Sequence, residues 1–187
     1  MSQNIYNQDL NLANSNNISQ KLFTHYQRKV KKNGGILLST ILEKGKEYQY
    51  QGIDRRLVIR KDNETYYLKV EEKIRRKFYN DFLFEIISND TENINSIKNI
   101  GWIKKDLSCD LISFYFIEKD KCYIFNWNVF KKTYELYGAE WIKLAINNEK
   151  GFRLVYAINK TYKSHNLIVP KDIFIKAYIK IFNSNLD

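Results

Sequence analysis

The fold is decided by residues 52–76, which read GIDRRLVIRKDNETYYLKVEEKIRR. Two runs rich in β-branched and aromatic residues, 56–60 and 65–74, lie on either side of the polar turn at 61–64. Alternating apolar side chains around a short polar turn are typical of an antiparallel β-hairpin. The sequence therefore predicts two paired strands here, each with side chains that point alternately to two faces.

Working outward from this hairpin, apolar residues that recur at three and four positions predict helices over 18–32, 127–146 and 170–182. Residues 36–42 form an apolar run that fits either a strand or a short helix. Further strands are predicted over 47–51, 82–87, 111–117, 122–126, 152–158 and 167–169. This order favours the α/β class, with a mixed central β-sheet flanked by helices. We expect one domain over 18–187, after a flexible polar arm at 1–17.

The charge balance points to a polyanionic partner. The chain has 187 residues, with 31 Lys and Arg against 21 Asp and Glu, which gives a net charge of +10. Such an excess favours nucleic acid, because each neutralised phosphate releases counterions. A membrane surface is the other acidic option, but the basic residues are spread along the chain rather than gathered on one amphipathic helix. We therefore expect no membrane partner.

The same sequence favours a cytoplasmic setting. No apolar stretch reaches the length of a transmembrane helix, and the polar N-terminus lacks the layout of a secretory signal. The two cysteines, Cys109 and Cys122, are too few to indicate a disulfide framework. Their spacing also excludes a CxxC zinc site.

The hairpin carries residues suited to metal-dependent chemistry. Asp54 follows Gly52, and Glu71 and Lys73 are two apart on a predicted strand, so both point to one face. If the two strands pair, Asp54 lies near Glu71, and two carboxylates suit a Mg²⁺ ion. Lys73 beside the metal can activate water or stabilise charge on a phosphate.

Glu72 leaves an alternative open. Strict alternation places Glu72 on the side of Leu68 and Val70, the apolar face of the strand. Either the strand bulges there or Glu72 is the metal ligand. Both glutamates stay candidates, with Glu71 preferred for its spacing to Lys73, and the Glu72 carbonyl can also supply an oxygen.

Gly52-Ile53-Asp54, the hairpin and Glu71-Glu72-Lys73 together resemble the PD-(D/E)xK nuclease superfamily over residues 36–126. Ile53 stands where the family name has Pro. The resemblance implies a restriction-endonuclease-like core and a Mg²⁺- or Mn²⁺-dependent endodeoxyribonuclease, with DNA favoured over RNA and a homodimer as one arrangement. It also implies that Glu85, on the next strand, adds a metal or supporting carboxylate. Glu43 or Glu47 would take the part of an acidic residue that precedes the core.

Several other polar or aromatic residues are candidates for contact with nucleic acid. They are Arg55, Arg75, Arg76, Lys77, Trp102, Lys104, Lys163, Ser164 and Asn166. Exposed cations and polar groups hold phosphates, and an exposed ring stacks on a base. The alternatives are a solvated charge run, a Trp that caps the core and an ordinary surface loop.

A second function class stays open from sequence. The chain fits a non-catalytic nucleic-acid- or protein-binding inhibitor of a nucleic-acid-processing complex, of phage or mobile-element origin. Binding without cleavage, undisturbed by Asp54→Ala, would distinguish this function from a nuclease.

Overall fold

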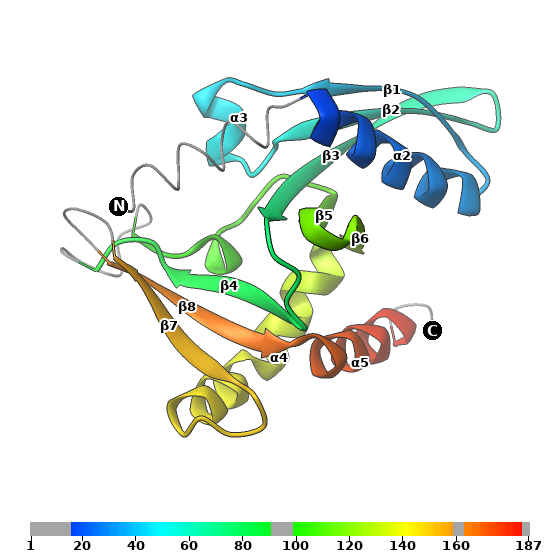
Figure 1. Ribbon diagram of the computed structural model, residues 1–187. Helices are drawn as coiled ribbons and strands as arrows, with labels where there is room; N and C mark the ends of the chain where they lie inside the picture. The colour runs from blue at the N-terminus through cyan, green and yellow to red at the C-terminus, as the bar shows by residue number, and fades with distance from the viewer. Residues whose placement is uncertain (1–15, 91–98, 159–162, 185–187) are drawn as a thin grey trace. The chain divides into compact units, whose positions relative to one another are not determined.

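The computed structural model describes residues 16–90, 99–158 and 163–184. These residues form two compact units, each built on its own β-sheet (Figure 1). The five-stranded unit comprises residues 16–78 and 107–127, and the rest of the described chain forms the three-stranded unit. The predicted α/β class is confirmed. The arm predicted at 1–17 lies outside the described residues, apart from Asn16 and Asn17, which begin the first helix.

The five-stranded sheet is mixed, as the sequence predicted. Its order is β1 (Ile36–Leu42), β2 (Arg55–Lys61), β3 (Glu64–Arg75), β5 (Leu111–Phe116) and β6 (Lys121–Asn126). The pairs β1–β2, β2–β3 and β5–β6 are antiparallel, whereas β3 and β5 are parallel. The open choice at 36–42 is settled as a strand.

The predicted hairpin forms with a regular register. Residue partners run without a break from Arg55 opposite Val70 to Lys61 opposite Glu64. The two turn residues between the strands, Asp62 and Asn63, have φ values of 52° and 66°. Asp and Asn tolerate this left-handed region better than most residues, and the turn that results matches the twist of paired strands.

Helix α2 (Asn16–Lys32) covers one face of this sheet, as Figure 1 shows. Its buried residues are Ile18, Leu22, Tyr26 and Val30, at the three-to-four spacing that defines one helix face. They pack into a core with buried residues of β1, β2, β3 and β5, namely Leu37, Leu57, Ile59, Val70 and Tyr115.

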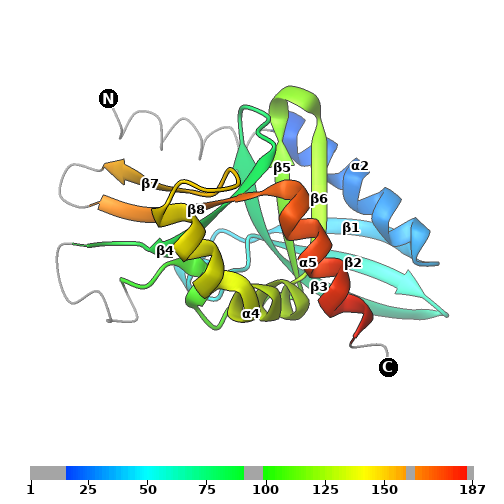
Figure 2. The same ribbon diagram turned by 90° about the horizontal axis from the view of Figure 1, so that it is seen from below.

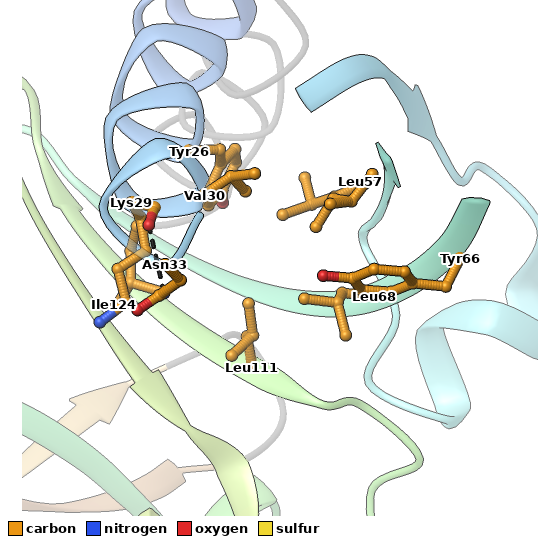
Figure 3. Close-up of a pocket in the computed structure, with 10 residues that line it drawn as sticks. Tyr26, Lys29, Val30, Asn33, Leu57, Tyr66, Leu68, Leu111 and Ile124 are labelled. Atoms are coloured by element: carbon orange, nitrogen blue, oxygen red, sulfur yellow. Dashed lines mark hydrogen bonds between the residues drawn. The ribbon is translucent and has the colours of Figure 1, made fainter. Parts of the chain in front are cut away.

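A cavity of about 80 Å³ lies beneath the end of α2 (Figure 3). Leu57, Leu68, Leu111 and Ile124 contribute to its wall, so the lining is mainly apolar. Asn33 closes the helix end by donating a hydrogen bond of 3.2 Å from Nδ2 to the Lys29 carbonyl. An apolar void of this size is a packing feature of the core rather than a site for a charged ligand.

The three-stranded sheet is antiparallel, in the order β4 (Asp81–Ile87), β8 (Lys163–Pro170) and β7 (Arg153–Ile158). Helices α4 (Trp127–Ile146) and α5 (Lys171–Asn183) pack on it (Figure 2). The ring of Phe84 on β4 lies 5.3 Å from Phe130 of α4 and 5.4 Å from Phe174 of α5. Phe130 and Phe174 are themselves 4.6 Å apart, so both helices cover the same face.

Three predicted elements differ in the structure. Of residues 47–51, predicted as a strand, residues 47–50 lie in a short helix, α3 (Lys46–Tyr50). Glu47 stands in its first turn, where a negative charge is favourable. The strand at 167–169 is longer and forms the centre of the second sheet as β8. The strand that bears Glu85 was expected in the same core as the hairpin, but it pairs with β8 in the three-stranded sheet.

Two 3₁₀ turns complete the described elements, η1 (Trp102–Lys104) and η2 (Ile117–Lys119). Among the described helices, none combines the length and the apolar character that a membrane crossing requires.

Candidate functional site

Asp54 is held by its backbone at the start of β2. Its N–H donates to the Val70 carbonyl at 2.9 Å, and its own carbonyl accepts the Glu43 N–H at 2.9 Å. Gly52, two residues earlier, has a φ of 67°, and a Cβ added there would lie 2.7 Å from the Leu107 Cδ1. Only glycine suits both the conformation and the space, so the turn that delivers Asp54 depends on this residue.

The partner strand brings Glu71 and Lys73 to the side of the sheet away from α2. Pairing of β3 with β5 is continuous from Val70 to Arg75, so the strand has no bulge at the motif. Val70 packs in the core beneath α2, and alternation therefore turns Glu71 and Lys73 to the opposite face. Glu71 is 7% exposed, and the Lys73 ammonium forms an ion pair with its carboxylate.

Glu72 points the other way, into a buried polar network under α2. Its carboxylate accepts hydrogen bonds from Arg55 Nε at 2.7 Å, Arg55 Nη2 at 3.3 Å and the Tyr26 hydroxyl at 2.7 Å. The side chains of Arg55 and Glu72 are only 3% and 5% exposed. The Glu72 side chain is therefore not a metal ligand beside Glu71, and Arg55 is not a phosphate contact. The alternation predicted from sequence holds.

The backbone of Glu72 nevertheless contributes to the site. Its N–H donates to Asp54 Oδ2 at 2.7 Å, which fixes the orientation of that carboxylate. The residue thus joins the two faces of the sheet, with its side chain in the α2 network and its amide against Asp54.

Burial and neighbouring carboxylates both shift the titration of groups at this site. Burial, and then the nearby Glu71 carboxylate, raise the pKa of Asp54 from 3.8 to about 7, against the opposing effects of the Glu72 N–H and Lys73. Burial and the same Glu71 charge raise the pKa of the Cys109 thiol to about 12. A cation placed beside two such carboxylates would stabilise their ionised forms, and strongly shifted pKa values are common at functional sites.

The donor set suits a hard divalent cation. Asp54 and Glu71 would supply carboxylate oxygens. They form a pair only, because the described residues contain no group of three or more His, Cys, Asp or Glu that could hold a metal. Mg²⁺ commonly takes one or two protein carboxylates and completes its shell with water and substrate phosphate. A pair of carboxylates with a neighbouring lysine fits that pattern.

The other predicted carboxylates lie elsewhere. Glu85 is on β4 in the second sheet, where it accepts a 2.5 Å hydrogen bond from Ser88 Oγ. Glu43 forms an ion pair with Arg56 and its side chain is 8% exposed, while Glu47 is exposed on α3. Among the interactions of the described residues, the side chains of these three glutamates make no contact with Asp54 or Glu71.

Three of the predicted nucleic-acid contacts in the second unit are buried. The Trp102 ring packs 6.0 Å from Phe84 and 6.3 Å from Phe130, which corrects its assignment as an exposed stacking platform. Ser164 and Asn166 are buried on the central strand β8, where Asn166 Nδ2 donates to Ser164 Oγ at 3.3 Å. Buried side chains cannot reach a phosphate or a base edge.

The remaining predicted contacts keep access to solvent. Arg75 is half-buried at the end of β3, with its guanidinium 5.9 Å from the Phe116 ring centroid. Arg76, Lys77, Lys104 and Lys163 are exposed.

Sequence reasoning missed the network of Tyr26, Glu72 and Arg55. The signal that could have revealed this network was Glu72, which stands at a position where the alternation of the strand expects an apolar residue. A charge in that position needs a buried partner, and the arginine next to Asp54 and the tyrosine on the apolar face of α2 supply it.

The chain matches no protein-family model, no curated protein and no solved structure in the three comparisons made. Its function is therefore inferred from its own residues and their geometry.

Proposed function

We propose that this protein is a Mg²⁺- or Mn²⁺-dependent nuclease that hydrolyses phosphodiester bonds, with DNA as the favoured substrate. One observation carries the proposal: the half-buried Asp54 feels the charge of the buried Glu71, and Lys73 forms an ion pair with Glu71. The two strands of one hairpin present all three groups on the same side of the sheet.

Each residue has a definite part in this chemistry. Asp54 and Glu71 would hold the cation, which supplies a polarised phosphate oxygen and a more acidic water molecule when bound. The Glu72 N–H keeps Asp54 Oδ2 in place, so the carboxylate needs little rearrangement on binding. Lys73, with its side chain 25% exposed, can orient the attacking water or stabilise charge that develops on the phosphate.

The resemblance to the PD-(D/E)xK superfamily supports the same function. Asp54, Glu71 and Lys73 stand at the positions of that motif. Glu71 and Lys73 are two residues apart and point to the same face of β3, which is the spacing of the acidic residue and the lysine in the motif. The strongly basic balance of the chain, +10, favours a nucleic-acid substrate. Pairing of the hairpin with a parallel strand, β5, is consistent with a mixed nuclease-type sheet.

The test is DNA turnover by purified protein with Mg²⁺, with Mn²⁺ and with EDTA. We expect metal-dependent cleavage that falls on the order of a hundredfold or more in Asp54→Asn, Glu71→Gln and Lys73→Ala, because each removes a group that acts on the reacting phosphate or water. An RNA substrate of the same sequence measures the preference for DNA.

Two control variants distinguish loss of a catalytic group from the general effect of removing a charge. Glu64→Gln changes an exposed carboxylate on the same strand, and Lys143→Ala an exposed lysine on α4. Both should keep wild-type turnover. Equal activity in wild type and Lys73→Ala would overturn the catalytic assignment. DNA binding without cleavage in either metal would favour a non-catalytic binding protein.

A further inference from the structure

Helix α2 carries only positive formal charges. It contains Lys21, Arg28, Lys29, Lys31 and Lys32, and no acidic residue. Three of these cations stand in its last turn, where the negative end of the helix dipole stabilises them. The concentration of charge is local, since these five residues occur within one 17-residue helix.

The four cations at the C-terminal half of α2 are accessible to a partner. Arg28, Lys29, Lys31 and Lys32 are all exposed. Further towards the N-terminus, His25 Nε2 pairs with Asp120 Oδ1 at 3.1 Å, and Lys21 also interacts electrostatically with Asp120. The strongest uncompensated charge is therefore at residues 28–32.

Shallow grooves run along both sides of this part of the helix. One, of about 340 Å³, lies between α2 and β6, with Arg28, Lys29, His25 and Tyr123 in its wall. The other, of about 420 Å³, lies between α2 and β1, with Arg28 and Lys31 in its wall. Arg28 borders both grooves, so the helix forms a cationic ridge between them.

The chemistry of the ridge favours nucleic acid over a membrane. An interfacial helix needs an apolar face to insert into lipid, but the apolar face of α2 is buried against the sheet. The exposed cations beside the groove at β6 are Arg28 and Lys29, whereas the His25 side chain is only 14% exposed and the Tyr123 ring packs against Phe116. A row of exposed cations suits the regularly spaced phosphates of a nucleic-acid backbone, because each phosphate neutralised releases counterions.

We propose that residues 28–32 of α2, with the groove beside β6, form a second nucleic-acid-binding surface that contacts the phosphate backbone. This surface lies on the face of the five-stranded sheet that α2 covers, whereas Asp54, Glu71 and Lys73 lie on the opposite face. It is thus separate from the proposed catalytic site, and its existence does not depend on the nuclease function.

The experiment measures binding of a fluorescently labelled single-stranded DNA of about 30 nucleotides, long enough to span such a surface, by full-length protein in EDTA. The test variant carries Arg28→Gln, Lys29→Gln, Lys31→Gln and Lys32→Gln. The control variant carries Lys143→Gln, Lys150→Gln, Lys176→Gln and Lys180→Gln, which removes the same charge from exposed positions of the other unit. Glutamine has nearly the helix propensity of lysine, so both variants should fold, and thermal melts verify this.

We expect the α2 variant to lose at least about tenfold in affinity and its salt slope to fall in magnitude by about three, because each phosphate contact contributes about 0.7 for a single strand. The control should bind like wild type. Equal affinity of the two variants overturns the proposal. Stronger displacement of DNA by polyglutamate or by phosphatidylserine vesicles than by unlabelled DNA also overturns it, in favour of an acidic protein or a membrane. Because EDTA prevents metal-dependent turnover, failure here is distinct from failure of the nuclease assignment.

Discussion

Two acidic side chains that share a buried position resist simultaneous ionisation. At Asp54 the cost of burial comes first and the charge of Glu71 adds to it, and together they outweigh the Glu72 N–H and Lys73. The result is a pKa of about 7 for Asp54, well above the ordinary carboxyl value of 3.8. In the proposed metal site, binding of a cation would compete with protonation of Asp54, since the metal takes the deprotonated carboxylate.

Asp54 gives the protein a particular pH dependence of stability in EDTA. Its folded pKa of about 7 lies above the ordinary value of 3.8, so the folded state binds more protons than the unfolded state between these values. The free energy of unfolding of wild type should therefore fall as pH rises from about 4 to about 7, by at most about 1.4 kcal/mol per pH unit from this group, and then level off.

Urea unfolding of wild type and Asp54→Asn across this pH range measures the effect. The variant lacks the titrating group, so its stability should fall less steeply in the same window. Parallel curves for the two proteins would contradict the raised pKa.

For single residues, the sequence predicted which side chains form the candidate site, but not which neighbouring side chains are buried. The spacing of Glu71 and Lys73 and the hairpin itself predicted that these groups meet Asp54. The burial of Arg55 could not be foreseen, because an arginine at the start of a strand is usually solvated. Its position became predictable only together with Tyr26, which is distant in sequence.

At the level of elements, α2 is tied to the sheet by polar contacts as well as by its apolar face. The Tyr26 hydroxyl reaches Glu72 of β3 and lies 2.9 Å from Ser113 Oγ of β5. Glu72 also accepts the hydrogen bonds of Arg55 on β2. Helix α2 and strands β2 and β3 therefore meet at the Glu72 carboxylate, and Tyr26 extends the network to β5.

Removing one partner of this buried ion pair should be costly. Arg55→Met leaves the Glu72 charge without its cation, and we expect a loss of about 3–5 kcal/mol in the free energy of unfolding. In the double variant Arg55→Met/Glu72→Leu, much of this loss should be recovered, because no buried charge remains and Tyr26 keeps Ser113 as a partner.

Urea denaturation measures both variants, with Lys61→Met at the exposed end of the same strand as the control. The control should change stability little. A double variant as unstable as Arg55→Met would show that the network acts through packing rather than through charge.

The sequence predicted most elements but not which sheet each joins. Alternation and turn residues identified β2, β3, β5 and β6, because each pattern is local. Residues 47–51 have the aromatic content of a strand, yet Gly45 and Glu47 begin a helix there. The partner of β4 could not be inferred, since β8 follows it by more than 70 residues and no local pattern encodes that pairing.

Over the whole molecule, the chain passes between its two units repeatedly. Residues 16–78 belong to the five-stranded unit, 79–106 to the other unit, 107–127 to the five-stranded unit again, and the described residues from 128 onward to the second unit. Strand β3 thus finds its parallel partner β5 only after the chain has contributed β4 to another sheet.

The fragment 1–78 should therefore not fold by itself. It contains α2, β1, β2 and β3 but lacks Tyr115 of the core and leaves the edge of β3 unpaired. We expect no cooperative urea transition by circular dichroism for this fragment, in contrast to the full-length chain. A cooperative transition would show that α2 and three strands are sufficient.

The interleaved order matters while the chain is being synthesised. Residues 76–110 must leave the ribosome before β5 can begin to cover β3, which at usual rates of translation takes roughly two to seven seconds. During that interval, the long and partly apolar strand β3 has an open edge to which another nascent chain can add. Chaperone capture of β3 at this stage, and crowding of polysomes at high expression, should thus govern the yield of soluble protein.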